Sequence, residues 1–429
     1  MASVPNTDND FRRNFGLGVL NGALFNAALA FLSGSTIMPV FISQLTESKV
    51  LIGLFSTLES FGWFFPQLFA AAFIAHRSRM IAFYNNLSFL RLGFFGLAIG
   101  GIFVFSNNPD GILLSFAICF GMLSIAAGFA GVAFTEIVGK TIPVNKRGSY
   151  FGLRMFIGGS LAAIEGIYVR RIISTYPFPY NFGYIYISAW ILMLLGLITF
   201  AYVREPESKH IIDRAPFSQQ LKSAWAVFRT NENFRLLFWS RLFINTIFLA
   251  LPFYVVFAIS RLGASESMAG IYLTAEMVGY LASNALWAWL SNHVSNRKVI
   301  IFAAVASLAP PLLAFIISFA HISPIAFSVV FLLLGMAESG IGMGYLNYLL
   351  EFLPERGRLL SIGLMHTLIA PTVFFSALGG LLGQVFSLRI IFFIVCVTTL
   401  VSLAISLKLK EPRVKLGMTI MPDAAGEIK

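Results

Sequence analysis

The segment from Ile42 to His76, ISQLTESKVLIGLFSTLESFGWFFPQLFAAAFIAH, recurs without a gap from Ile259 to His293 as ISRLGASESMAGIYLTAEMVGYLASNALWAWLSNH, at a constant offset of 217 residues. The residues identical in both copies include Gly53 and Gly270, Thr57 and Thr274, Glu59 and Glu276, and Gly62 and Gly279. A repeat at half the chain length is typical of membrane proteins built from two parallel six-helix repeats around a central cavity. The sequence therefore predicts two similar halves.

The composition indicates that lipid surrounds most of this chain. Of the 429 residues, 58% are hydrophobic and 11% are charged, and the mean hydropathy is +0.81. This is far more apolar surface than one soluble core could bury. Apolar runs of about 20 residues fit membrane-spanning helices, whereas a membrane barrel would show alternating stretches of about 10 residues. We therefore predict an all-α integral membrane protein.

Hydropathy predicts twelve transmembrane helices. They are expected at about 15–44, 50–74, 81–105, 111–138, 150–172, 183–203, 235–258, 267–290, 299–319, 324–350, 360–384 and 388–407. Most of the 30 Lys and Arg residues fall in the even-numbered loops and the two tails, whereas the odd-numbered loops contain Lys49, Arg170, Arg171, Arg261 and Arg389. Because short cytoplasmic loops retain positive charge, both termini are expected in the cytoplasm and the helix count is expected to be even.

The longest polar interruption follows the sixth predicted helix and divides the chain. We predict a cytoplasmic tail at 1–14, a six-helix bundle at 15–203, a cytoplasmic linker at 204–234, a second bundle at 235–407 and a cytoplasmic tail at 408–429. Within the linker, Phe217, Leu221, Trp225 and Phe228 share one helical face, which predicts a short amphipathic helix lying on the inner leaflet.

A second, gapped correspondence places Arg147-Gly148 beside Arg356-Gly357. Two six-helix halves, a charged central loop and Arg-Gly loops of this kind resemble the major facilitator superfamily (MFS) over essentially the whole chain. The resemblance implies a transporter in which helices 1, 4, 7 and 10 line the pathway. The family's Asp-Arg-x-Gly-Arg-Arg loop reads His76-Arg77-Ser78-Arg79 here. Since the Asp is missing, the resemblance does not extend to the gating ion pair that the family builds there.

Two further segments resemble a poorly characterised bacterial subgroup of these facilitators. They are Ser33-Gly34-Ser35-Thr36 with Pro39, and Gly62-Trp63 with Pro66-Gln67. The subgroup includes magnetosome-membrane members linked to iron, so the resemblance implies a location in the bacterial inner membrane or an invagination of it. Transport of iron or of a metal complex is one of the functions that it implies.

The strongest candidates for a site are two carboxylates at corresponding positions of the repeat. Glu59 is followed by Trp63 and Gln67 on one helical face, and Glu276 is followed in the same way by Tyr280 and Asn284. Ionisable groups at bilayer depth cost roughly 2.5 to 3.5 kcal/mol each, so they are usually paired or line a cavity. These residues either bind a solute and a proton or, alternatively, fix the packing between helices of each half.

Other charged groups at bilayer depth are Arg91, Arg241 and Glu338. Arg91 either neutralises Glu59 or faces an anionic solute. Arg241, one turn before Asn245, either takes part in transport or extends its side chain to the inner surface. Glu338 lies in a glycine-rich helix, which permits close approach or flexing of a cavity helix. In the first helix, Asn26 is a polar group suited to a solute if it faces the cavity.

We therefore predict a secondary transporter that moves a small solute by alternating access, with proton coupling through Glu59 or Glu276 as one alternative. A transporter-fold sensor or assembly scaffold without transport is the other reading. Organic ions, drugs, sugars and metal complexes remain open as substrates. No enzyme activity, cofactor, metal centre or nucleic-acid partner is expected, because no paired nucleophile and base, ligand cluster or Gly-Lys-Ser/Thr loop occurs in the sequence. The oligomeric state is open.

Overall fold

The computed structural model describes residues 8–64, 79–207, 225–226, 228–320, 322–353 and 358–412, with residues 8, 59–64, 144–145 and 358–360 described by their backbone alone. The described part of the chain is helical and contains no strand. The helices of the first half are α1 (Asp8–Ala30), α2 (Ile37–Ser43), α3 (Lys49–Phe64), α5 (Ile81–Val104), α6 (Pro109–Thr141), α7 (Val144–Thr175) and α8 (Tyr180–Ala201). Those of the second half are α10 (Glu232–Ile244), α11 (Ile247–Ala250), α12 (Phe253–Leu262), α13 (Met268–His293), α14 (Asn296–Ile317), α15 (Ser328–Phe352), α16 (Arg358–Ile369), η1 (Ala370–Phe374), α17 (Phe375–Val385) and α18 (Leu388–Ser406).

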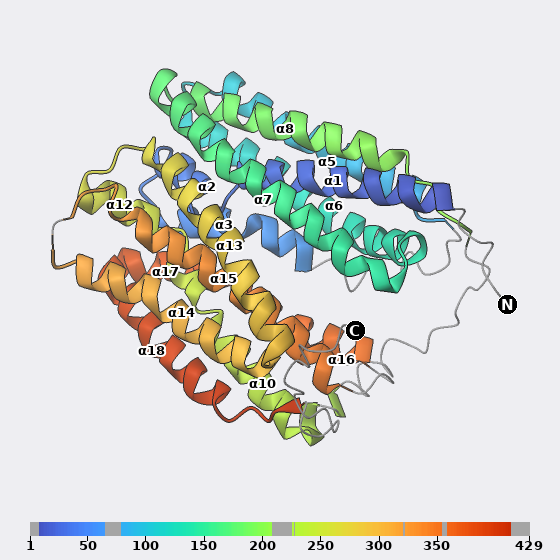
Figure 1. Cartoon of the computed structure of the whole chain (residues 1–429). Coiled ribbons are helices and arrows are strands. Elements are labelled where there is room, and N and C mark those ends of the chain that lie inside the picture. The colour runs from blue at the N-terminus through green and yellow to red at the C-terminus, as the bar shows by residue number, and fades with distance from the viewer. Residues whose placement is uncertain are drawn as a thin grey trace, which may run out of the picture.

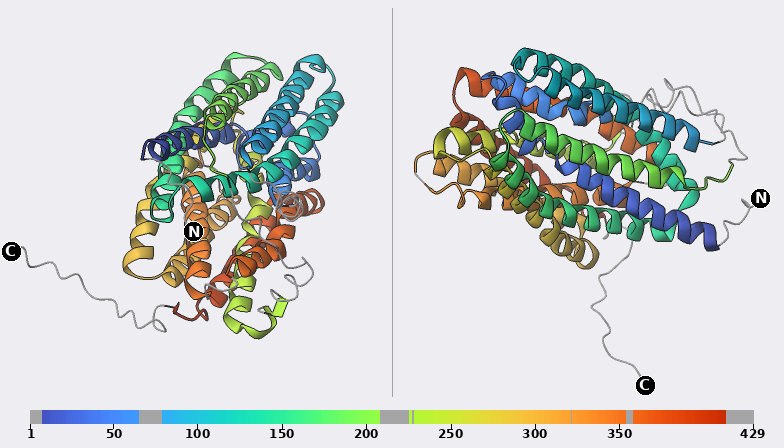
Figure 2. Two further views of the ribbon diagram at one scale, coloured as in Figure 1. Left: turned by 90° about the vertical axis from the view of Figure 1, so that its right-hand side faces the viewer. Right: turned by 90° about the horizontal axis from the view of Figure 1, so that it is seen from above.

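The two halves lie beside each other, with their helices running along the long axis of the molecule (Figures 1 and 2). Helix α1 begins and α18 ends at the same end, which we call the terminal end (Figure 1). There, the first helix of each half is hydrogen-bonded to the residues that follow its last helix: Asn14 bonds the backbone of Arg204, and Asn233 bonds the backbone of Lys410. We call the opposite end, where residues 44–48 and 263–267 turn, the far end.

The predicted membrane helices have helical counterparts in the structure. Nine helical segments among the described residues are long and apolar enough to cross a membrane. The remaining three places in the predicted order are taken by α1 with α2, by α3 and by α13. The all-α membrane fold is therefore confirmed. Helix α1 begins at Asp8, before the expected start at about 15, because a hydropathy pattern marks the apolar stretch and not the polar turns that continue the helix.

Three helices that the sequence predicts as continuous are interrupted. The first is broken between Ala30 and Ile37, where the hydroxyls of Ser33, Ser35 and Thr36 hydrogen-bond one another. The segment from α10 to α12 and the segment from α16 to α17 are broken near Pro252 and Pro371. Proline lacks the N–H group that would continue the helical bonds. All three breaks lie in helices at the interface between the halves.

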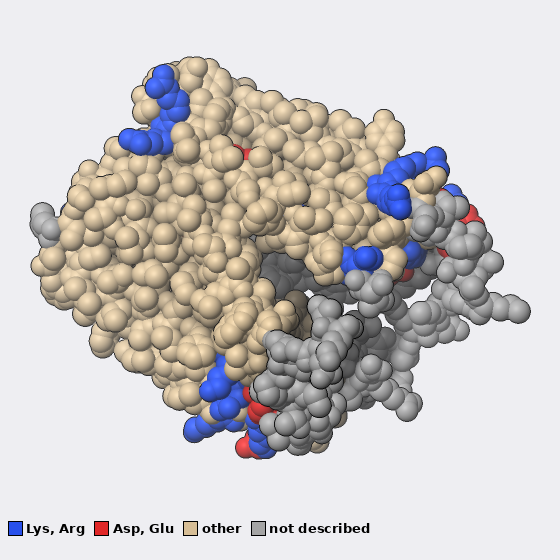
Figure 3. All heavy atoms as spheres, in the orientation of Figure 1, with Lys and Arg blue, Asp and Glu red and all other residues tan. Residues whose placement is uncertain are grey.

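The surface of the molecule fits a lipid environment. On the face shown in Figure 3, Lys and Arg gather toward the two ends and leave a broad belt without them. Large apolar side chains such as Leu114, Phe156 and Phe393 are more than half exposed, as lipid-facing residues are. The surface is hollowed between the two halves toward the terminal end (Figure 3).

The halves meet along two seams, each built on glycine. In the first seam, α3 lies against α17, and in the second, α7 lies against α13. A Cβ atom at Gly53 would collide with the backbone of Ser376, and one at Gly380 with the backbone of Lys49. In the second seam, Gly166 and Gly270 are each in contact with the other's backbone. Such close approach requires residues without side chains at these positions, as in other packed membrane helices.

Candidate functional site

A cavity of about 500 Å³ lies between the two halves. The first half contributes α3 and α6, and the second contributes α10, α15, α16 and η1. Its polar lining includes Thr57, Thr135, Arg241, Asn245, His366 and Thr372. The cavity therefore lies at the interface that alternating-access transporters use, with the carboxyl end of α10 and the break between α16 and α17 in its wall.

The break after α10 and the break between α16 and α17 are joined by hydrogen bonds at this cavity. The side chain of Asn245 is at the carboxyl end of α10 and donates a 2.9 Å hydrogen bond to the hydroxyl of Thr372 in η1. Ser376, at the start of α17, donates a 2.8 Å bond to the carbonyl of Phe248. Discontinuous helices place backbone and side-chain polar groups at membrane depth only where they line a cavity or are buried in protein.

Arg241 supplies the charge of this central cavity. Its guanidinium donates a 3.2 Å bond to the carbonyl of Ile341 and lies 4.8 Å from the centre of the Tyr345 ring. It also acts electrostatically on His366, across the cavity lining. Arg241 therefore faces the cavity, and its part in transport stays a prediction.

A second cavity, of about 430 Å³, lies within the first half. Asn26, Arg91 and Arg154 line it, together with largely apolar residues of α1, α5, α6, α7 and α8. Arg154 is well satisfied, because it donates to the carbonyl of Gly18 at 2.6 Å and to Tyr150 at 3.0 Å. Arg91 is 4% exposed, and its guanidinium lies 4.7 Å from the Phe25 ring.

Glu276 joins the two halves by hydrogen bonds rather than lining either cavity. The hydroxyl of Ser35, in the break after α1, lies 2.9 Å from one carboxyl oxygen of Glu276 and 2.6 Å from the other. Both residues are 3% exposed. Glu338, on the neighbouring α15, acts electrostatically on Glu276. This contact brings the polar Ser-Gly-Ser-Thr segment of the first half onto a buried acid of the second.

The predicted site residues thus fall into separate places. Arg241 and Asn245 line the central cavity, Asn26 and Arg91 line the cavity of the first half, and Glu276 lies near Glu338 outside both. Tyr280 and Asn284 also lie outside these two cavities, with Asn284 accepting a 2.9 Å bond from Ser339. The side chains of Glu59 and Trp63, and all of Gln67, lie outside the described residues, as do most of the predicted amphipathic helix and the loop at 76–78.

Several residues at these places are absent from the predicted site. Arg154 and His366 are ionisable groups within predicted helices, so their depth in the bilayer is a signal that could have placed them there. Thr57 and Thr372 carry no such signal, because hydroxyl residues are common on every helix face. Ser35 is recognisable only through its tertiary contact with Glu276.

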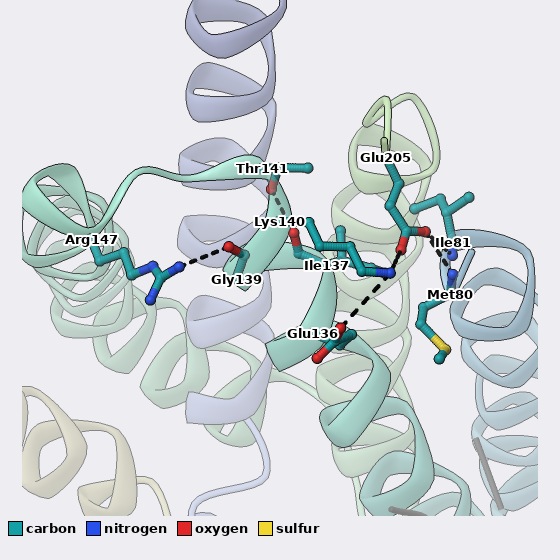
Figure 4. A network of polar contacts seen from close by, with 9 residues as sticks. All are labelled: Met80, Ile81, Glu136, Ile137, Gly139, Lys140, Thr141, Arg147 and Glu205. Carbon is teal, nitrogen blue, oxygen red and sulfur yellow. Dashed lines mark hydrogen bonds and ion pairs between the residues drawn. The ribbon is translucent and has the colours of Figure 1, made fainter. Parts of the chain in front are cut away.

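At the terminal end, Glu205 holds three helices of the first half together (Figure 4). Its carboxylate accepts bonds from the backbone N–H groups of Met80 and Ile81 at 2.6 and 2.7 Å, and from Lys140 at 2.7 Å. The acid thus sits at the amino end of α5, where the helix dipole favours negative charge. Arg147 caps the end of α6 by bonding the carbonyl of Gly139 at 2.7 Å. Neither role is predicted from the sequence.

Comparisons with known proteins agree with this architecture. The family model of the Major Facilitator Superfamily matches residues 248–418, in the second half. No curated protein matches the sequence. The chain is similar in structure to a D-xylose-proton symporter, with a TM-score of 0.68, 16% identity, and coverage of 94% of this chain and 98% of that one. It is similar to a POT family transporter in complex with 5-aminolevulinic acid, with a TM-score of 0.69, 13% identity, and coverage of 92% and 97%.

A bacterial homologue of the iron transporter ferroportin gives a third likeness. In its inward-facing state the TM-score is 0.65, at 14% identity over 93% of this chain and 98% of that one. In its outward-facing state the TM-score is 0.58, at 14% identity over 92% and 99%. At these identities the likeness concerns the fold, and it extends over both halves. The second half thus matches the family model, and the whole chain shares the fold of these transporters.

Proposed function

We propose that the protein is a secondary active transporter that carries a small solute through the central cavity by alternating access. The observation that carries the proposal is the cavity of about 500 Å³ between two halves that touch through glycine seams at the far end. Rocking of the halves about these seams would expose the cavity first to one side of the membrane and then to the other. The fold and family support a carrier rather than an enzyme.

The arrangement of the halves corresponds to an inward-open carrier, with the terminal end in the cytoplasm. The hollow between the halves faces the terminal end (Figure 3), and the likeness to the ferroportin homologue is closer in its inward-facing state. The terminal end also carries most basic loops, which favours the cytoplasmic side. We place the protein in the bacterial inner membrane or an invagination of it, with both termini cytoplasmic.

Proton coupling through Glu276 is the mechanism that the contacts support best. Two neighbouring carboxyl groups in a water-poor interior are not readily ionised together. The charge on Glu276 sets the strength of its bond to Ser35, because a charged acceptor forms the stronger hydrogen bond. Gain or loss of a proton would therefore change how firmly the break after α1 is held to α13, and so bias the two conformations. Glu59 is the corresponding acid of the first half.

Transport by purified protein in vesicles tests the proposal. We expect uptake of at least one solute of a broad panel (sugars, nucleosides, peptides, organic ions and iron complexes), driven by an imposed proton gradient. Glu276→Gln should lower gradient-driven uptake about tenfold or more while leaving solute exchange at equilibrium, and Glu59→Gln tests the other half. Glu266→Gln, at an exposed far-end carboxylate, is the control.

Uptake that keeps its gradient dependence in the double variant Glu59→Gln/Glu276→Gln would exclude coupling through these acids. No flux of any solute by folded protein would exclude the carrier and leave a sensor or assembly scaffold with a transporter fold.

A further inference from the structure

The charged side chains that line the two cavities all have one sign. Arg241 lines the central cavity, and Arg91 and Arg154 line the cavity of the first half. Among the described lining residues of both cavities there is no aspartate or glutamate. Two acids within helices of the second half, Glu276 and Glu338, line neither cavity, and Glu276 is hydrogen-bonded to Ser35.

The positive charge of Arg241 lacks a counter-charge within the described part of the chain. No ion pair to Arg241 occurs among the described residues, and its guanidinium donates a hydrogen bond to one backbone carbonyl. A guanidinium carries five N–H donors in a planar fork that matches a carboxylate or phosphate. Keeping such a group at membrane depth without an anion is costly. The free donors therefore point to an anionic group from outside the chain.

We infer that the solute of the central cavity is an organic anion. This inference rests on the proposed transport function and names its substrate class. The acidic group of the solute binds Arg241, and the imidazole of His366, in the same cavity lining, offers a second hydrogen-bond donor. Asn245 and Thr57 offer polar contacts to the rest of the molecule, and Phe248 and Leu346 give it an apolar wall. A bare divalent cation meets only repulsion from Arg241, whereas a metal bound to an excess of carboxylates carries the required negative charge.

Binding to the purified protein in detergent tests the class of solute directly, without transport. The probes are matched sets of three: a carboxylate, its neutral amide and the corresponding primary amine, each on the same aliphatic or aromatic skeleton. Calorimetry and ligand-dependent thermal stabilisation report affinity. We expect at least one carboxylate to bind, and its amide and amine partners to bind about tenfold more weakly or not at all.

Two variants and a control locate the charge. Arg241→Gln should lower carboxylate affinity by about ten- to a hundredfold, the range for loss of a charge-assisted bond. Arg241→Lys keeps the charge but not the fork and should recover part of this loss. Arg261→Gln removes an exposed arginine at the end of α12, outside the cavity, and should leave affinity unchanged. Thermal unfolding without ligand shows that each variant is folded.

Different results would overturn the assignment of an anionic substrate and the proposal of transport. A set of binders without a carboxylate, or a carboxylate that binds Arg241→Gln as well as the unaltered protein, overturns the anion assignment even if vesicles show flux of another solute. Carboxylate binding that is lost in Arg241→Gln supports the assignment. If that carboxylate is not carried into vesicles, the transport proposal fails while the anion site stands.

Discussion

The two seams between the halves occupy equivalent positions in the repeat but have different surroundings. In the first, α3 lies on α17 and Gly53 touches the backbone of Ser376; in the second, α13 lies on α7 and Gly270 touches Gly166. Gly53 and Gly270 are the same position of the repeat. The backbone contact is thus a shared requirement of the fold.

The polar residues beside these glycines have diverged. Thr57 bonds the carbonyl of Leu54 in its own helix and lines the central cavity, whereas its repeat partner Thr274 donates a 2.8 Å bond across the second seam to Ala163. The second seam also has Glu276 close by, bonded to Ser35. The first seam therefore places a threonine hydroxyl at the central cavity, whereas the second places the equivalent hydroxyl in the contact between the halves. The two copies of the repeat share the glycine contact and differ in where this hydroxyl lies.

The largest effect is expected where the seams are alike. Gly270→Val or Gly53→Val places side-chain atoms against the opposing backbone, so the halves must separate or distort. We expect a loss of about 3 kcal/mol or more in stability, the upper range for overpacking, measured as thermal unfolding in detergent. Gly100→Val is the control, because a Cβ atom there meets no atom within 4 Å. Tolerance of valine at one glycine but not the other would break the equivalence of the seams.

A smaller loss of stability is expected when the hydrogen bond between Ser35 and Glu276, near the second seam, is removed. Ser35→Ala removes the hydroxyl bonded to the buried Glu276, which costs about 1–3 kcal/mol for an unsatisfied buried group. We expect lower thermal stability and greater reactivity of a cysteine introduced at the far end, because this contact holds that end closed. Ser43→Ala is the control, since Ser43 bonds Val40 within its own helix. Unchanged reactivity in Ser35→Ala would show that the contact does not hold the halves.

The smallest effects are expected at Thr57 and Thr274, the equivalent threonines of the repeat, and they should differ in kind. Thr274→Val removes a bond across the second seam and should cost about 1 kcal/mol of stability, without change in solute affinity. Thr57→Val removes a local bond and a cavity hydroxyl, so it should change solute affinity with little change in stability. Thr399→Val is the control, because its buried hydroxyl has no hydrogen-bond partner within the described structure. Equal responses of Thr57 and Thr274 in both assays would contradict this difference.

The sequence predicted the fold closely because its signals are local or repeated. The positions of the helices follow from apolar runs, and the resemblance of the halves follows from the match between 42–76 and 259–293. The breaks at Pro252 and Pro371 were not predicted, since apolar sequence continues through them and hydropathy does not register a missing N–H group.

The candidate site was predicted only in part. Glu276 attracted attention as a buried acid, and Arg241 and Asn245 as polar groups at depth, but their neighbours come from elsewhere in the chain. Ser35 is 241 residues from Glu276, and Thr372 is 127 residues from Asn245. Such pairs depend on how α1, α10 and α16 end and on which faces meet across the halves, and no single-sequence pattern contains that information.

The sequence by itself determined that this chain spans a membrane, that it consists of two related halves, and which ionisable groups are forced into the bilayer. Composition and periodicity suffice for that, because lipid requires long apolar helices. The tertiary structure alone decided that Arg241 faces a cavity without a described acid, while Glu276 is bonded to Ser35. Whether a buried charge is satisfied depends on groups distant in sequence, which only the packing of the two halves brings into contact.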